Sequence, residues 1–222
     1  MNTLWNPLWN DIFRSRSWGS YPEDALIRFI ATNYYKRSPR SECSILDLGC
    51  GTGASTWYLC REGFCVTAVD GAAEGVELVR KRLENEGLSA ALDVADIAAL
   101  TYAPESFDCI VDVACLMCNG YADVKALMPR LKSLLKPGGK LFSFTARDGC
   151  WGDGIGRPLG HNTYIDSQEG PFARMGTVRF SNEQGIREIY GCFPKISLDY
   201  VERSIESRKH IVSHWVVTCE RE

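Results

Sequence analysis

The 222-residue chain lacks both the long apolar runs of a membrane protein and a marked excess of charge of one sign. Its 25 Lys and Arg side chains are balanced by 28 Asp and Glu, so the formal net charge is −3. A chain this close to neutrality has no general attraction for nucleic-acid phosphates or anionic lipid. No uncharged apolar stretch approaches the roughly 20 residues that span a bilayer. We therefore expect neither a nucleic acid nor a membrane as partner.

Features of exported and metal-binding proteins are also scarce. The first residues, MNTLWNPLWNDIF, have no basic segment followed by an apolar core, so no secretory signal is expected. Half of the ten cysteines lie in or beside apolar runs, where cysteine acts as a small hydrophobic side chain. Cys115 and Cys118 form a lone C-x-x-C without a second pair, which does not predict a zinc site. The sequence thus predicts a reduced, cytoplasmic protein without a metal.

Strand and helix patterns alternate through the middle of the chain, from Ser44 to about residue 145. Apolar runs predict strands over residues 44–48, 64–69, 88–94, 107–113 and 140–145. Helical patterns separate several of these strands, over residues 54–62, 72–86 and 122–135. Repeated strand–helix units indicate a parallel sheet with helices on both faces.

The segments on either side of this middle part follow other patterns. Before it, Trp5, Trp9 and Phe13 lie four residues apart on one predicted helical face. After it, residues 147–176 are rich in Gly, Asp, Asn and Pro and predict a long irregular loop. A short helix is expected from a capping box at residues 181–184. The last two strands are expected to form an antiparallel hairpin, over residues 196–202 and 210–219.

The stretch ILDLGCGTGAST, residues 45–56, carries the clearest functional pattern. Gly49, Gly51 and Gly53 lie between a predicted strand and a predicted helix, which permits a tight turn and close approach of a ligand. Asp70, at the end of the next strand, follows at the spacing typical of a ribose-binding acid. These residues predict a nucleoside ligand, and by themselves they leave a nicotinamide cofactor and another nucleoside both open.

Three further features favour a nucleoside other than a nicotinamide cofactor. Asp47 lies two residues before the first glycine, where its carboxylate can anchor the loop and favour a ligand ammonium group. Asp96 follows the third predicted strand and is followed by Ile97, a pair suited to an adenine ring and its amino group. The chain also ends in the predicted antiparallel hairpin and not in another parallel strand–helix unit.

Taken together, five ordered segments resemble the motifs of the class I S-adenosylmethionine-dependent methyltransferases: ILDLGCGTG, VTAVDGA, DVADI, FDCIVDV and LLKPGGKLF. The resemblance covers about residues 44–145. It implies an α/β fold with a Rossmann-like, doubly wound sheet of seven strands, in the order 3-2-1-4-5-7-6, with strand 7 antiparallel. The expected single domain, 1–222, has four parts: a helical lid (1–43), a cofactor-binding core (44–145), an acceptor-site loop (146–180), and a helix with the terminal β-hairpin (181–222).

The resemblance also implies which residues hold the methionine half of S-adenosylmethionine. Four residues of the glycine loop would lie along it: Gly49, Cys50, Gly51 and Gly53. Val113, just after the fourth strand, would flank the sulfonium. Trp18 and Tyr21 belong to the aromatic amino-terminal segment, and we expect one of them to close over this end of the cofactor and the acceptor.

The nucleoside half of the cofactor is implied to contact the ends of the second and third strands. Asp70 would hold the ribose hydroxyls, and Gly71 would lie near the adenine. Asp96 would receive the adenine N6 amino group, with Ile97 on the ring face. A purely structural interpretation exists for each acid, since Asp70 could cap the following helix and Asp96 could be a turn residue.

Methyl transfer chiefly requires alignment and exclusion of water, and it needs a base only for a hydroxyl or a protonated amine. Position at the carboxyl ends of the strands makes Asp112 and the pair Cys118-Asn119 candidates. His161, in the long loop, is a further candidate base. A satisfied strand-end carboxylate and an exposed loop histidine are the structural alternatives for Asp112 and His161. The remaining two histidines, on a predicted hairpin strand, are expected to be structural: His210 and His214.

The acceptor is expected to be a small molecule methylated at oxygen or nitrogen. The fourth strand is followed by Asp112-Val113-Ala114-Cys115 and not by an Asn-Pro-Pro-Tyr-type motif, which disfavours a nucleobase. A nearly neutral, aromatic lid also suits a small molecule better than a nucleic acid. Two other functions stay open, namely an NAD(P)-dependent oxidoreductase and an S-adenosylmethionine-binding regulatory protein without turnover. The sequence indicates no oligomeric state.

Overall fold

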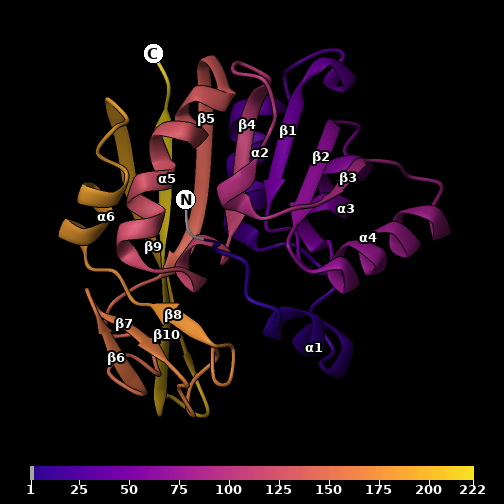
Figure 1. Cartoon of the computed structure of the whole chain (residues 1–222). Coiled ribbons are helices and arrows are strands. Elements are labelled where there is room, and N and C mark those ends of the chain that lie inside the picture. Colours follow the sequence, from indigo (N-terminus) through magenta and orange to yellow (C-terminus); the bar gives the residue numbers. More distant parts are fainter. Residues whose placement is uncertain (1–2) are drawn as a thin grey trace.

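The computed structural model describes residues 3–222, and a mixed seven-stranded sheet forms its centre (Figure 1). The strands lie side by side in this order: β3 (Ala91–Val94), β2 (Cys65–Asp70), β1 (Ser44–Leu48), β4 (Phe107–Val113), β5 (Leu135–Ala146), β10 (His210–Glu220) and β9 (Lys195–Ile205). Neighbours among the first five strands pair in parallel, whereas β10 is antiparallel to both β5 and β9. The predicted strand order and the antiparallel seventh strand are confirmed.

Helices cover both faces of the sheet (Figure 1). One face packs against α2 (Asp24–Tyr34), α3 (Ala54–Arg61) and α4 (Ala73–Asn85). The other packs against α5 (Tyr121–Leu134) and α6 (Glu183–Ile189). Successive strand residues point to opposite faces, so β1 is apolar on both sides and contributes to both halves of the core. Within residues 3–222, no helix has the length and apolar character required to cross a bilayer.

The connections at the carboxyl ends of the parallel strands are short and turn sharply. Two of them contain 3₁₀ helices, η2 (Ile97–Ala99) after β3 and η3 (Leu116–Cys118) after β4. The amino-terminal helix α1 (Leu8–Ser15) packs against α4 at this edge of the sheet. The remaining 3₁₀ helix, η1 (Arg40–Glu42), leads into β1 at the opposite end of that strand. Side chains from distant parts of the chain therefore meet at the carboxyl edge.

The segment after β5 is more regular than its composition predicts. Instead of an irregular loop over residues 147–176, it contains a three-stranded antiparallel sheet of β6 (Arg157–Gly160), β7 (Thr163–Ile165) and β8 (Thr177–Arg179). The expectation was wrong because strands of three or four residues are too short to show a period. Their order comes from a separate apolar cluster in which Phe180 and Met117 are fully buried.

A second difference concerns the start of β5. The expected strand begins at Lys140, after a stop at Pro137-Gly138-Gly139, but β5 begins at Leu135, directly after α5. Gly138 N–H donates to the carbonyl of Arg221, and Arg221 N–H donates to the carbonyl of Gly139. The end of the chain thus supplies the backbone partners of these two glycines.

Arg179 joins the small sheet to the core. Its side chain is 1% exposed, and its guanidinium donates to the carbonyl oxygens of Leu116 and Asn119 and to the hydroxyl of Ser181. Two of these acceptors lie in the turn that follows β4. A buried guanidinium satisfied by carbonyl oxygens is costly to replace, because the acceptors lose a charged donor.

We therefore expect Arg179→Met to lower the free energy of unfolding by about 3 kcal/mol. Urea denaturation followed by circular dichroism measures this. The control is Arg187→Met, which removes an exposed ion pair with Glu183 on α6 and should change stability by less than about 0.5 kcal/mol. Equal effects of the two substitutions would contradict a structural role for Arg179.

Candidate active site

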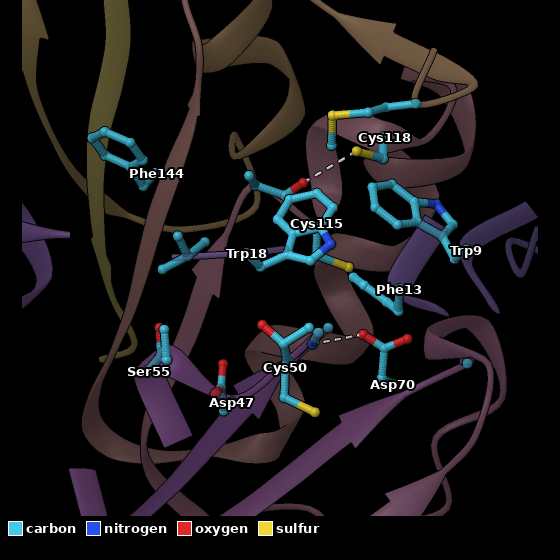
Figure 2. A pocket seen from close by; sticks show the side chains of 18 of the residues that line it. Trp9, Phe13, Trp18, Asp47, Cys50, Ser55, Asp70, Cys115, Cys118 and Phe144 are labelled. Carbon is cyan, nitrogen blue, oxygen red and sulfur yellow. Dashed lines mark hydrogen bonds between the residues drawn. The ribbon is translucent and has the colours of Figure 1, made fainter. Parts of the chain in front are cut away.

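A cavity of about 350 Å³ opens at the carboxyl ends of β1, β2 and β4 (Figure 2). Its volume lies in the range of pockets for small ligands, and its position is the usual one in open α/β sheets. The glycine loop after β1, the ends of β2 and β3 and the turn after β4 line it, and the amino-terminal aromatic segment, the insertion between β5 and α6, and single residues of β5 and β10 complete it. Of the sequence-predicted cofactor residues, ten contribute to the lining: Trp18, Asp47, Gly49, Cys50, Gly51, Asp70, Gly71, Asp96, Ile97 and Val113.

The glycine loop is held tightly against the end of β2. The backbone N–H groups of Gly49 and Cys50 both donate to the carbonyl of Val69, at 2.8 and 3.0 Å. Gly49 has a φ of +71°, and a Cβ there would lie 2.3 Å from Cys115 Sγ, so only glycine fits. Gly53 is the exception among the predicted residues, because it lies outside the cavity lining and faces Val79 on α4.

Asp47 lies beneath this loop and is buried. Its carboxylate accepts a hydrogen bond of 2.6 Å from the hydroxyl of Thr56 at the start of α3. Burial, together with the nearby carboxylates of Asp70 and Asp112, raises the pKa of Asp47 to about 7, against the opposing effect of the hydrogen bond from Thr56. A cationic group in the cavity would stabilise the ionised form of Asp47.

Asp70 ends β2 and anchors two backbone turns at once. Its carboxylate oxygens accept from the N–H of Gly51 at 2.9 Å and from the N–H of Ala72 at 2.8 Å. Burial raises the pKa of Asp70, and the two backbone donors oppose that shift. Each oxygen accepts one hydrogen bond and keeps a lone pair that could receive a ligand hydroxyl (Figure 2).

The carboxylate of Asp96 accepts hydrogen bonds from residues near the start of the chain. One carboxylate oxygen accepts from the hydroxyl of Thr3 and from the N–H groups of Leu4 and Trp5, at 2.5, 2.8 and 3.1 Å. The ring of Trp5 also packs on Gly71, where an added Cβ would lie 2.2 Å from it. Residues 3–5, here called the strap, therefore cover the end of the cavity that the sequence assigns to adenine.

Aromatic rings from the amino-terminal segment form one wall. Trp9, Phe13 and Trp18 contact one another, with ring centroids 5.3 to 6.2 Å apart. Trp18 lies across the middle of the cavity in Figure 2, above the glycine loop. Its indole N–H is buried and has no hydrogen-bond partner within residues 3–222. Tyr21 lines the same cavity but is 79% exposed and packs edge-on against Trp57.

Of the candidate bases predicted from the sequence, Cys118 and Asn119 line the cavity, whereas His161 and Asp112 do not. His161 lies in the turn between β6 and β7, where its exposed ring stacks on Tyr121 with centroids 4.1 Å apart. Asp112 is fully buried, and its carboxylate accepts from the hydroxyl of Ser143 and from two backbone N–H groups of the following turn. The structure corrects both assignments: His161 is carried outward by the small sheet, and Asp112 stabilises the turn after β4.

Several lining residues were missed by sequence reasoning. His214, expected to be structural, lines the cavity and stacks on Phe144 with centroids 4.3 Å apart. The signal was available, because an antiparallel β10 begins at the carboxyl edge of the parallel strands. Phe172 and Met175 come from the insertion, whose local pattern gave no indication of them. His210 stacks on Trp151 outside the lining.

Comparison with known proteins gives partial matches in sequence. Residues 45–139 match a family model described as a methyltransferase domain. An uncharacterized methyltransferase, YodH of Bacillus subtilis, is 32% identical over 111 residues, which are 50% of this chain and 46% of that protein. A ubiquinone biosynthesis O-methyltransferase of Xylella fastidiosa is 37% identical over 112 residues, 50% of this chain and 44% of that protein. The chain thus spans about half the length of these relatives.

Solved structures match over more of the chain at lower identity. A protein from a study of the conversion of a disulfide bond into a thioacetal group during echinomycin biosynthesis has a TM-score of 0.70 at 20% identity, covering 97% of this chain and 91% of that one. An S-adenosylmethionine-dependent methyltransferase of Methanosarcina mazei has a TM-score of 0.68 at 19% identity, covering 86% and 96%. At these identities the likeness shows the fold alone.

The buried Asp47 generates a prediction about stability and pH. Because its folded-state pKa is raised to about 7, the fold favours the protonated form. This contribution to stability is full below about pH 4 and is lost as the pH rises through 7. Asp47→Asn cannot ionise, so its stability relative to the native protein should increase with pH, by up to about 1.4 kcal/mol per unit. Urea unfolding at pH 5, 6 and 7 measures the difference, and a constant difference would contradict it.

Proposed function

We propose that this chain moves a methyl group to a small molecule. The premise is that residues 45–139 form a methyltransferase domain of the class I S-adenosylmethionine-dependent family. One observation carries the proposal. A single cavity joins the glycine loop and Asp70 to an aromatic chamber at the carboxyl edge of the sheet. The family match favours this reading over an NAD(P)-dependent oxidoreductase. A measurement of methyl transfer distinguishes this proposed function from that of a regulatory protein without turnover.

The residues of the cavity fit S-adenosylmethionine. Asp70 retains lone pairs for ribose hydroxyls, and the unpartnered indole N–H of Trp18 can donate to a ligand oxygen. The bare loop at Gly49 and Gly51 admits a ligand against the backbone, and Asp47 favours a positive charge nearby. When bound, S-adenosylmethionine supplies a methyl group already activated by its sulfonium. Among the predicted contacts, Val113 and Ile97 provide apolar surface.

The charged side chains that line the cavity restrict the kinds of acceptor that can bind there. Four acidic residues line it, but no Lys or Arg does among the residues described. Three of the four, Asp47, Asp70 and Asp96, accept hydrogen bonds from the protein itself. An anionic acceptor would find no countercharge here, and a nucleic acid would find no basic surface. The acceptor is therefore a small molecule without negative charge, and oxygen is its reacting atom, as the names of the ubiquinone-biosynthesis relatives indicate for them.

The chain's own contribution is alignment and exclusion of water. The glycine loop and Asp70 fix one partner of the reaction, while the aromatic wall of Trp9, Phe13 and Trp18 encloses the other. Holding two reactants in line can lower the barrier by several kcal/mol, and a dry cavity prevents competing hydrolysis.

The proposed function is tested with S-adenosylmethionine labelled in its methyl group and a fractionated cell extract. Label should enter the small-molecule fraction and not the protein or nucleic-acid fractions. Label found only in macromolecules would refute a small-molecule acceptor. Binding of S-adenosylhomocysteine with no transfer to any fraction would favour the regulatory alternative.

The ribose assignment predicts that Asp70→Asn weakens S-adenosylhomocysteine binding at least tenfold, because hydrogen bonds to a charged acceptor are lost. Isothermal titration calorimetry measures the dissociation constant. The matched control is Glu77→Gln, which removes an exposed carboxylate that pairs with Arg80 and Lys81 on α4. Unchanged affinity for S-adenosylhomocysteine in a folded Asp70→Asn protein would contradict the assignment of Asp70 to the ribose.

The strap generates a separate prediction about adenine. Oδ2 of Asp96 already accepts from Thr3, Leu4 and Trp5, whereas Oδ1 accepts from the N–H of Ala98 and keeps a lone pair. The adenine amino group can bind Oδ2 only after the strap has left. Deleting residues 1–6 should then tighten S-adenosylhomocysteine binding by about tenfold, since this competition is removed. A loss of affinity on deletion would instead make the strap part of the adenine site.

A further inference from the structure

The acceptor side of the cavity contains one histidine that none of the roles above uses. His214 lies on β10, and its ring is held between two aromatic side chains. It stacks on Phe144 of β5 with an interplanar angle of 15°, and it meets Phe172 of the insertion edge-on, with centroids 5.7 Å apart. These contacts orient the imidazole through its faces and, within the described part of the chain, leave its ring nitrogens available to a ligand in the cavity.

The surroundings keep this imidazole uncharged. Phe144 on β5 and Phe172 in the insertion are apolar, and the charged group that acts on the ring from β9 is Arg203. Burial, and to a lesser extent the charge of Arg203, lowers the pKa of His214 to about 4. The acids of the cavity, Asp47 and Asp70, lie on the glycine-loop side, below Phe144 and Trp18 in Figure 2. At neutral pH, His214 is therefore a hydrogen-bond acceptor.

The walls around His214 define the shape and polarity of what fits beside it. Trp18, Phe144, Phe172 and Met175 present flat or polarizable apolar surface. A planar, uncharged molecule with one hydroxyl to donate matches this set. We propose that the acceptor is an aromatic alcohol and that His214 takes the proton of its hydroxyl during methyl transfer. This inference rests on the proposed function and specifies its acceptor.

The acceptor hydroxyl, the methyl donor and His214 together account for every atom and electron pair in the methyl-transfer step. The hydroxyl oxygen forms a bond to the methyl carbon as the carbon–sulfur bond breaks, and the electron pair of that bond stays on sulfur. The hydroxyl proton moves to a ring nitrogen of His214, which later releases it to water. A weak base suffices, because the oxygen becomes strongly acidic as its bond to carbon forms. An alkylamine does not fit as well, since it is protonated at neutral pH and His214 is too weak a base to take that proton.

The test uses phenols of graded acidity with the full-length protein. Methyl transfer to 4-methoxyphenol, phenol and 4-nitrophenol is measured for native protein, His214→Gln and the matched control His210→Gln. We expect His214→Gln to reduce kcat about 100-fold for the weakly acidic phenols and much less for 4-nitrophenol, which is largely ionised at pH 8. His210→Gln should behave like the native protein, because His210 lies outside the cavity.

Two binding measurements complete the test. His214→Gln should leave the dissociation constant of S-adenosylhomocysteine unchanged, and bound phenol should shift the nuclear magnetic resonance signals of the His214 ring in the native protein. An equal loss of kcat for all three phenols, or a parallel loss of cofactor affinity, would show a structural role and overturn the proposal.

The acceptor class is tested by the native protein itself. If it methylates no phenol but still labels the small-molecule fraction of an extract, the aromatic-alcohol acceptor is wrong and the proposed function stands. If it neither binds S-adenosylhomocysteine nor transfers label, the proposed function fails.

Discussion

The hydrogen bonds between the glycine loop and the end of β2 are the constraint on which the rest of the site depends. Gly49 and Cys50 share the carbonyl of Val69, and Gly51 donates to Asp70. These contacts bring a bare backbone and a buried carboxylate together at the carboxyl edge. They also fix the start of α3, so the position of Asp47 beneath the loop follows from the same few bonds. Any side chain at Gly49 would collide with Cys115 and displace the turn after β4 as well.

The site separates charge from apolar surface. Three of its carboxylates, Asp47, Asp70 and Asp96, lie at the ends of the parallel strands, and each is held by donors of the protein, so this negative charge is localised where a cationic cofactor is proposed to bind. The other side consists of rings and sulfur atoms around an uncharged His214. Such a division suits a reaction between a cationic donor and a neutral acceptor, because each reactant meets the environment that stabilises it.

Segments outside the strand–helix core complete the cavity. The amino-terminal segment supplies Trp9, Phe13 and Trp18, and the insertion supplies Phe172 and Met175. Trp9, Trp18, Phe172 and Met175 pack in or against one apolar cluster, which also contains Met117 from the turn after β4. Arg179 binds the same turn from the opposite side. The aromatic part of the cavity is thus attached to the core through the turn after β4. A change in that turn would alter both the aromatic part of the cavity and the core.

The sequence by itself determined the central sheet and the place of the glycine loop, because both depend on patterns within short windows. Apolar runs and glycine spacing located β1, β2 and β4, and the family resemblance supplied the strand order. Only the tertiary structure decided the partners of Asp96, the burial of Asp112 and the opposite positions of His161 and His214. Those outcomes depend on contacts between distant segments, such as Asp96 with Leu4 or His214 with Phe144. No local periodicity encodes such pairings, since they arise from strand direction and from the packing of segments that carry no period of their own.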